Sequence, residues 1–187
     1  IYVVGGRLKR TPDSANLSDH YDTASLLIFD PITGVWSSAP DAPTARNSHA
    51  AAVIDGKMYV VGGRQFTAQE SGEYANVNVA SLEVYDPEAE TWEPLVPLPQ
   101  AAGGITATAV DGKLYVFGGE QWVPELAVIA EAWVYDPALA QWTSLPAMPA
   151  PRHGMAAGAI GNQIYVIGGA TETGAGAVNT NETLLVR

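Results

Sequence analysis

Arginine is the side chain best suited to bind a carboxylate or sulfate group, and two arginines directly follow a Gly-Gly pair. These are Arg7 and Arg64, while two further copies of the pair are followed by Glu120 and Ala170. We therefore include Arg7, Arg64 and Glu120 among the candidate binding residues. The acidic and aromatic stretch that begins at Glu120 is the most distinctive of the segments that follow these pairs.

Arg46 and Arg152 hold a second repeated position, at the start of an alanine-rich segment, and Ala102 lies between them in register. Near the axis of a repeating fold, such side chains could line a central pocket and bind an anionic ligand. The alternative is that they bridge neighbouring repeats through carbonyl groups or carboxylates. Both interpretations of Arg46 and Arg152 stay open from the sequence.

Two histidines and one tryptophan stand outside the repeat. His49 aligns with Met155, and His153 aligns with Asn47, so neither histidine recurs. We expect both to be binding candidates near the axis, and the alternative is a buried, hydrogen-bonded histidine. Trp122 lies on a connection of variable length, where it could stack on a sugar, anchor a partner protein or pack on its own loop.

No residue pattern indicates catalysis, and we predict no catalytic residue, no metal site and no cofactor. The chain has no cysteine, and it lacks a nucleophile elbow, a phosphate-binding loop and a zinc-protease motif. A net charge of −11 argues against nucleic-acid binding, and no apolar run approaches the roughly 18 residues that span a membrane. We expect neither kind of partner, and the composition leaves the localisation open.

The elements that position these side chains come from an internal repeat. An apolar segment ends in a Gly-Gly pair, a later segment ends in Asp-Pro, and a tryptophan always lies six residues beyond that aspartate. Only the connection between the glycine pair and the aspartate varies in length. The glycine pairs are 5–6, 62–63, 118–119 and 168–169, and the Asp/Trp pairs are Asp30/Trp36, Asp86/Trp92 and Asp136/Trp142.

Each repeat holds four strand-sized segments, and no pattern with a helical period competes with them. Asp-Gly turns at Asp55 and Asp111 predict a tight hairpin between the first two strands. The second strand is apolar throughout, as in a strand covered on both faces. In the last repeat we place Arg187 where Tyr85 stands in an earlier one. The repeat boundaries fall at about 1–45, 46–101, 102–151 and 152–187.

The pattern of Gly-Gly, Tyr-Asp-Pro and tryptophan resembles the Kelch repeat over essentially the whole chain. The resemblance implies an all-β fold, a β-propeller of four-stranded antiparallel blades that usually has six or seven blades. About three and a half blades are present in residues 1–187, because the first lacks its first strand and the last lacks its fourth. We expect the ring to be completed by missing blades of the same chain, with completion by oligomerisation as the alternative.

The variable connections between the second and third strands all leave from one face, so we predict that a ligand binds there. The family resemblance implies a non-catalytic binding scaffold for a protein or carbohydrate ligand. One alternative is a sugar-acting enzyme similar to Kelch-type mutarotases or epimerases, with an axial pocket that Arg46, Arg152 and Glu120 permit. Another is a structural module of a larger secreted protein, for which the glycosylation patterns at Asn16 and Asn181 are weak support.

Overall fold

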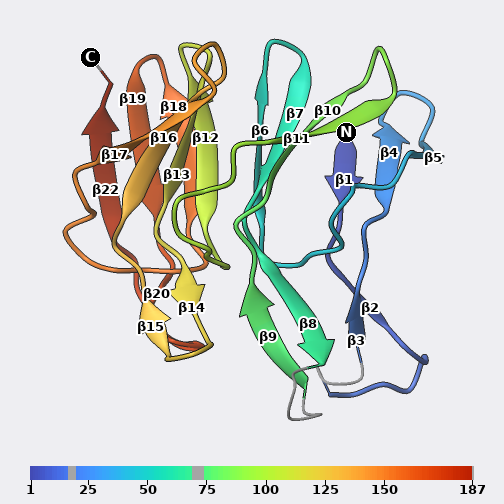
Figure 1. Cartoon of the computed structure of the whole chain (residues 1–187), viewed down its shortest axis with the longest axis horizontal. Helices are drawn as coiled ribbons and strands as arrows, with labels where there is room; N and C mark the ends of the chain where they lie inside the picture. The colour runs from blue at the N-terminus through green and yellow to red at the C-terminus, as the bar shows by residue number, and fades with distance from the viewer. Residues whose placement is uncertain (17–19, 69–73, 187) are drawn as a thin grey trace.

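The described chain is built of antiparallel strands, which form four sheets of three or four strands, each of them one blade, and four two-stranded sheets (Figure 1). The computed structural model describes residues 1–16, 20–68 and 74–186. The four blades hold three, four, four and three strands, which confirms the predicted all-β fold and the partial first and last blades. Within the described ranges there is no helix long and apolar enough to cross a membrane.

The blades follow one another in chain order, and in the first sheet β4 lies between β1 and β5. The second and third blades are complete, and in the last sheet β19 lies between β18 and β22. The innermost strands β6, β12 and β18 lie side by side. The strands are β1 (Tyr2–Val4), β4 (Leu26–Asp30) and β5 (Val35–Ala39); β6 (Ala50–Ile54), β7 (Lys57–Val61), β10 (Leu82–Asp86) and β11 (Thr91–Leu95); β12 (Thr106–Val110), β13 (Lys113–Phe117), β16 (Ala132–Asp136) and β17 (Gln141–Leu145); and β18 (Ala156–Ile160), β19 (Gln163–Ile167) and β22 (Asn181–Leu185).

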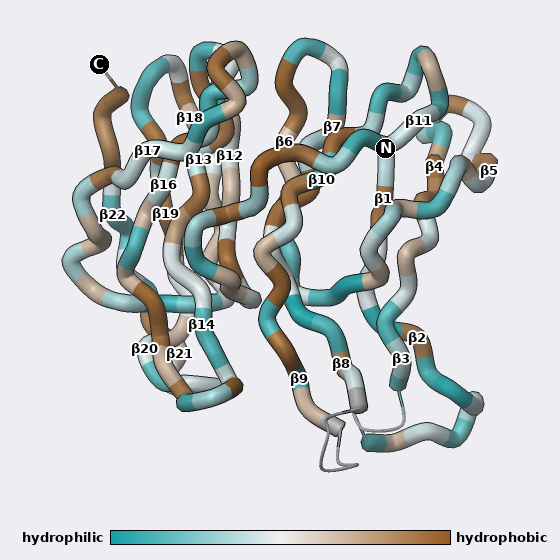
Figure 2. Tube along the Cα trace, viewed as in Figure 1, coloured by the Kyte–Doolittle hydropathy of each residue, from teal (hydrophilic) through white to brown (hydrophobic). Residues whose placement is uncertain are grey.

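The hydrophobic core lies between the blades. Apolar residues concentrate along strands such as β6 and β13 (Figure 2). The rings of Tyr85 and Trp92 lie 5.1 Å apart, and the Trp92 indole N–H donates a 2.9 Å hydrogen bond to the Pro40 carbonyl of the preceding blade. Trp142 reaches back to Val96 in the same way, also at 2.9 Å. The recurring tryptophan therefore joins one blade to the blade before it.

The Gly-Gly pairs form the seam to the blade that follows. The Gly119 N–H donates to the Arg152 carbonyl at 2.8 Å, and a Cβ on Gly118 would lie only 2.4 Å from that same oxygen. Both glycines have positive φ angles, 58° and 115°, which strain any other residue. Gly62 and Gly63 make the same seam with the Ala102 carbonyl. The close approach expected from the repeat is thus a contact between main chains.

A second set of main-chain bonds runs around the axis, at the start of the innermost strands. Ser48, Gly104 and Gly154 each adopt a left-handed conformation, with φ angles of 54°, 66° and 65°. The Gly104 N–H donates to the Ser48 carbonyl at 2.8 Å, and the Gly154 N–H donates to the Gly104 carbonyl at 2.7 Å. One peptide group from each of three blades is thereby linked to the next.

The repeated aspartates stabilise the turns before the outermost strands. The Asp86 carboxylate accepts the Glu88 N–H at 2.9 Å and pairs with the Lys57 ammonium at 2.8 Å. These hydrogen bonds, that of Lys57 first, hold the pKa of Asp86 below its ordinary value. Asp136 pairs with Lys113 in the same way, at 2.9 Å.

The register of the last blade corrects one prediction. Leu184 pairs with Ile164, as Tyr85 pairs with Met58 in the second blade. Leu184, and not Arg187, therefore takes the place of Tyr85. The connection that precedes β22 is shorter than the alignment of the repeats predicted, because β22 already begins at Asn181. Arg187 itself lies outside the described residues.

Candidate functional site

The variable connections predicted as loops are β-hairpins that project from one side of the blades (Figure 1). Each follows a Gly-Gly pair and precedes the third strand of its blade. We call the surface that they form the hairpin face. The hairpins are β2 (Arg7–Lys9) with β3 (His20–Asp22), β8 (Arg64–Ala68) with β9 (Tyr74–Asn78), β14 (Glu120–Gln121) with β15 (Ala127–Val128), and β20 (Ala170–Glu172) with β21 (Ala175–Ala177).

Glu120 is a hub that joins three blades at the base of this face. Its carboxylate is buried, with 3% of the residue exposed, and forms an ion pair with Arg64 of the second blade. From the fourth blade, His153 Nδ1 lies 3.4 Å from Oε1, and the Gly174 N–H donates to Oε2 at 3.2 Å. The other imidazole nitrogen lies 2.9 Å from the Glu172 carbonyl. Three predicted binding residues therefore meet at one place.

Arg64 reaches Glu120 by crossing the main chain of the third blade at a glycine. A Cβ on Gly103 would lie 2.4 Å from Arg64 Cγ, so that path requires a residue without a side chain. The Trp122 ring covers the guanidinium, with its centroid 5.6 Å from Cζ. Burial lowers the pKa of Arg64, and the Glu120 charge opposes that effect. Arg64, Trp122 and Glu120 thus form one stacked and charge-paired unit.

Asp22 is a second hub, between the first and second blades, and the sequence did not indicate it. Its carboxylate accepts the Asn47 side-chain amide at 2.7 Å and the Phe66 N–H at 2.6 Å. Arg7 lies beside it, with Nε 3.5 Å from Oδ1, and also donates to the Asn76 side chain. Arg7 therefore lies on the same face as the Glu120 unit, one blade away from Arg64.

The hairpins are bonded to one another as well as to their own blades. The Asn78 amide donates to the Glu120 carbonyl at 2.9 Å, which joins the second hairpin to the third. Gly174 joins the fourth hairpin to Glu120, and Asp22 joins the first to the second. The four hairpins are therefore fixed relative to one another, and a surface fixed in this way has less conformational entropy to lose on binding.

Arg46 and Arg152 lie inside their own blades rather than on the hairpin face. Arg46 is 1% exposed, its Nη2 lies 2.6 Å from Glu83 Oε2, and its Nη1 donates to the Gly62 carbonyl at 3.0 Å. Arg152 pairs with Glu182 at 2.5 Å in the same way. Both guanidinium groups are therefore neutralised by carboxylates of this chain.

The third blade replaces this ion pair with an apolar one. Ala102 stands in the place of Arg46, because it also offers its carbonyl to a glycine pair. Trp133 stands in the place of Glu83, since the two residues pair with Val116 and Val60 at matching positions of their sheets. The same site in the fold is thus filled either by a buried ion pair or by alanine and tryptophan.

His49 lies at the seam between the first two blades, where its ring would touch a Cβ on Gly5 at 2.9 Å. Burial, with the nearby Arg46 charge as a smaller cause, lowers the pKa of His49 from 6.5 to about 4. At neutral pH the imidazole is therefore uncharged.

This pKa makes His49 a source of acid sensitivity. As the pH falls from about 6.5 to about 4, the unfolded chain takes up a proton at His49 that the folded chain does not, so the free energy of unfolding falls. We expect His49→Met, the residue type of the equivalent Met155, to remove a loss on the order of 3 kcal/mol over that range. Denaturant titrations at several pH values measure it, and parallel pH profiles for the two proteins would contradict it.

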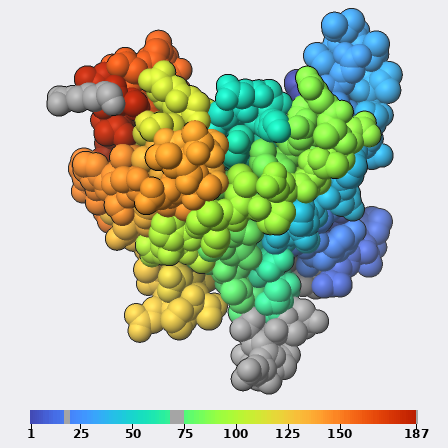
Figure 3. All heavy atoms as spheres, turned by 45° about the horizontal axis from the view of Figure 1, so that its top comes forward, coloured from blue at the N-terminus to red at the C-terminus, as the bar shows by residue number. Residues whose placement is uncertain are grey.

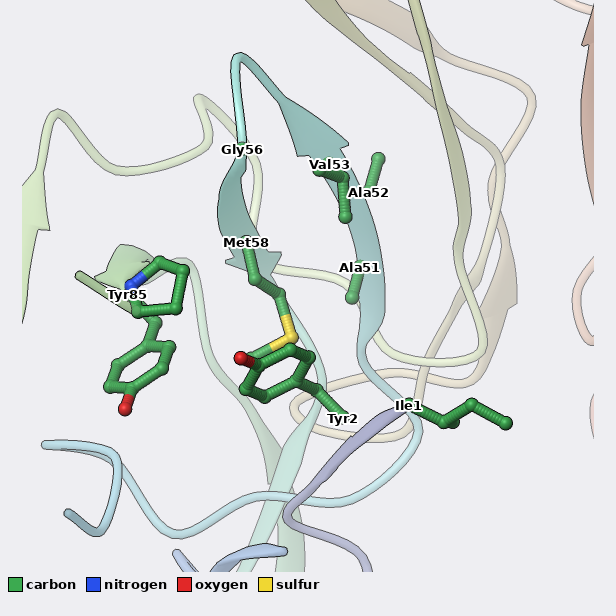
Figure 4. A pocket seen from close by; sticks show the side chains of 9 residues that line it. Ile1, Tyr2, Ala51, Ala52, Val53, Gly56, Met58 and Tyr85 are labelled. Atoms are coloured by element: carbon green, nitrogen blue, oxygen red, sulfur yellow. The ribbon is translucent and has the colours of Figure 1, made fainter. Parts of the chain in front are cut away.

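A pocket of about 370 Å³ lies between β1 and β6 and away from the hairpin face. Its lining is mostly apolar, and Figure 4 shows the Met58 side chain extending toward the Tyr2 ring. Among the described residues, no three His, Cys, Asp or Glu side chains gather closely enough to hold a metal ion. None of the eight predicted binding residues lines this pocket.

These blades and their bonded seams define an open arc of a β-propeller. A family model described as the KLHDC2/KLHL20/DRC7 Kelch-repeats domain matches residues 1–184. The chain belongs to the Kelch-repeat family.

Similar proteins include the F-box/kelch-repeat protein At1g67480 of Arabidopsis thaliana, 36% identical over 52% of this chain and 24% of that protein. Human Kelch repeat and BTB domain-containing protein 13 is 29% identical over 71% of this chain and 26% of that protein. The chain thus spans about a quarter of the length of these two relatives. A solved structure of YjhT matches 88% of this chain and 61% of its own, with a TM-score of 0.69 and 18% identity, which shows the shared fold.

Proposed function

We propose that this chain is a non-catalytic binding segment that engages a protein partner through the hairpin face. The observation that carries the proposal is the bonded layer of four hairpins. The only connections that vary in length between repeats are also the ones held in place by Asp22 and Glu120. Rigid elements that carry variable segments are a common arrangement for recognition surfaces. The names of the relatives, which pair Kelch repeats with F-box or BTB domains, are compatible with a partner-binding role.

Variants on the two opposite faces test this proposal. In the hairpin variant, residues 122–126 are replaced by glycine and serine. In the turn variant, Glu88→Ser and Glu90→Gly change the β10–β11 turn on the opposite face. We expect quantitative affinity capture with the turn variant to retain the partners of the unchanged protein, and capture with the hairpin variant to lose them. Partners that bind the hairpin variant and the turn variant equally would refute binding through the hairpin face.

The arginines that suggested a sugar-acting enzyme do not favour it. Such an enzyme needs unpaired guanidinium groups around an axial pocket. Arg46, Arg152 and Arg64 are each paired with a glutamate of this chain. We therefore propose Arg7, Arg64, Glu120, Trp122 and His153 as parts of, or supports for, a binding surface, and assign Arg46, Arg152 and His49 to the stability of the blades.

Completion of the ring is proposed from the two ends of the arc. Val53 beside the β1–β6 pocket is 62% exposed, and Ile160 in the last blade is 74% exposed. Trp36 is 55% exposed, whereas Trp92 and Trp142 each contact a preceding blade. We propose that further blades of the same chain cover these side chains; a second copy of the chain is the alternative.

A further inference from the structure

The tip of the third hairpin, residues 122–126, carries a group of exposed apolar side chains. Trp122, Val123 and Leu126 are 38%, 39% and 67% exposed. In Figure 3 this hairpin protrudes from the body of the molecule as a yellow knob. Exposure of an apolar cluster to water is unfavourable, and a partner that covers the cluster removes this cost.

Trp122 is held in place from below. Its ring lies over the Arg64 guanidinium, which is itself fixed by the buried Glu120 carboxylate. The indole therefore offers a positioned apolar surface, and tryptophan is among the residues that contribute most energy to protein interfaces. The tip is pre-organised as an anchor site rather than being a loose loop.

The exposed charges that the third and fourth hairpins carry all have one sign. Between residues 114 and 186 the sequence holds a single lysine or arginine, Arg152, which is fully buried and paired with Glu182. Glu125 and Glu172, in the third and fourth hairpins, are exposed, and among the described residues neither has an ion-pair partner. The third and fourth hairpins thus present apolar side chains among unpaired carboxylates.

We propose that this tip binds a cationic segment of a partner protein, in which one apolar side chain packs on Trp122 while lysine or arginine side chains face Glu125 and Glu172. The inference rests on the proposed function and specifies the chemistry of its partner. Charge complementarity selects such a segment over an acidic one, and the same carboxylates repel membranes and nucleic acids.

Two short fluorescent peptide pools with random sequence around a fixed leucine or phenylalanine test the proposal. One pool draws its flanking positions from lysine and arginine, and the other from aspartate and glutamate. By fluorescence anisotropy we expect the cationic pool to bind at least about tenfold more tightly, with an affinity that falls as salt rises.

Trp122→Ala should weaken binding of the cationic pool about tenfold or more, and the pair Glu125→Gln with Glu172→Gln should weaken it several-fold and flatten the salt dependence. The matched pair Glu88→Gln with Glu90→Gln, on the opposite side, should leave it unchanged.

Each other outcome overturns the inference in a distinguishable way. Equal binding of the two pools, or unchanged binding by the Trp122→Ala protein, refutes the cationic partner while the partner-capture result for the hairpin face still stands. Loss of binding through Glu88→Gln and Glu90→Gln instead would place recognition on the opposite face and refute the proposed function as well. Circular dichroism of each variant confirms that the blades remain folded.

Discussion

Replacing Arg46 with alanine is expected to lower the free energy of unfolding by about 3–5 kcal/mol, because it leaves the buried Glu83 carboxylate without its cation while the Thr44 hydroxyl still donates to it. Glu83 is 2% exposed, so its carboxylate is shielded from bulk water. Arg46 also donates to the Gly62 and Ser81 carbonyls, and both hydrogen bonds are lost. Denaturant unfolding of the variant and the unchanged protein measures the difference.

The third blade supplies the rescue for this variant. It fills the same two places with Ala102 and Trp133, which are 0% and 5% exposed. The double variant Arg46→Ala with Glu83→Trp should therefore recover at least about half of the loss, since no charge is left buried. Lys57→Ala removes a solvent-exposed ion pair and should change stability by less than about 1 kcal/mol. A loss for Arg46→Ala as small as that of Lys57→Ala would contradict a structural role for the buried pair.

Gly118→Ala is expected to have an effect of similar size, about 3 kcal/mol or more, because two penalties act together. The new Cβ would lie 2.4 Å from the Arg152 carbonyl of the next blade, and the residue would keep a φ angle of 58°. The seam between the third and fourth blades would have to open.

Gly112→Ala separates these two penalties. Gly112 also has a positive φ angle, 71°, but nothing lies within 4 Å of the position of its Cβ. Its substitution should cost about 1–2 kcal/mol, the conformational part alone. Thermal or denaturant unfolding of the two variants, measured under one set of conditions, separates the cost of the backbone conformation from the cost of the contact with Arg152. Equal losses would show that the approach to Arg152 contributes nothing.

The blade strands could be predicted from the sequence because each of their signals is local and repeated. Asp55 marks a hairpin turn, Tyr85 and Trp92 mark the outer strands, and the Gly-Gly pairs mark the seams. These residues recur because every blade meets the same neighbour in the same way. One misplacement, that of Arg187, arose where the repeat loses its aspartate and tryptophan and only the pairing with β19 fixes the register.

The site could be predicted only in part, because its partners come from different repeats. Arg64, Glu120, Trp122 and His153 stood out by type, yet nothing local indicates that the Glu120 carboxylate receives groups from both the second and the fourth blade. Asp22 gave no signal, since its partners are as far away as Phe66. Glu83 did carry a usable signal. A glutamate between the apolar residues of β10 is expected to be buried, and a buried carboxylate needs a cation beside it.

The main-chain bonds that link Ser48, Gly104 and Gly154 bear on how such a molecule evolves. A hydrogen bond between peptide groups uses no side-chain atoms, so beyond the left-handed backbone that favours glycine at these positions it places no demand on the side chains of the two blades. A gene segment that encodes one blade can therefore be duplicated, and the new copy already has the contacts that join it to both neighbours. The hairpins are then free to diverge in sequence. The same axial peptides that hold the blades together allow a lineage to add or remove whole repeats while the hairpins change.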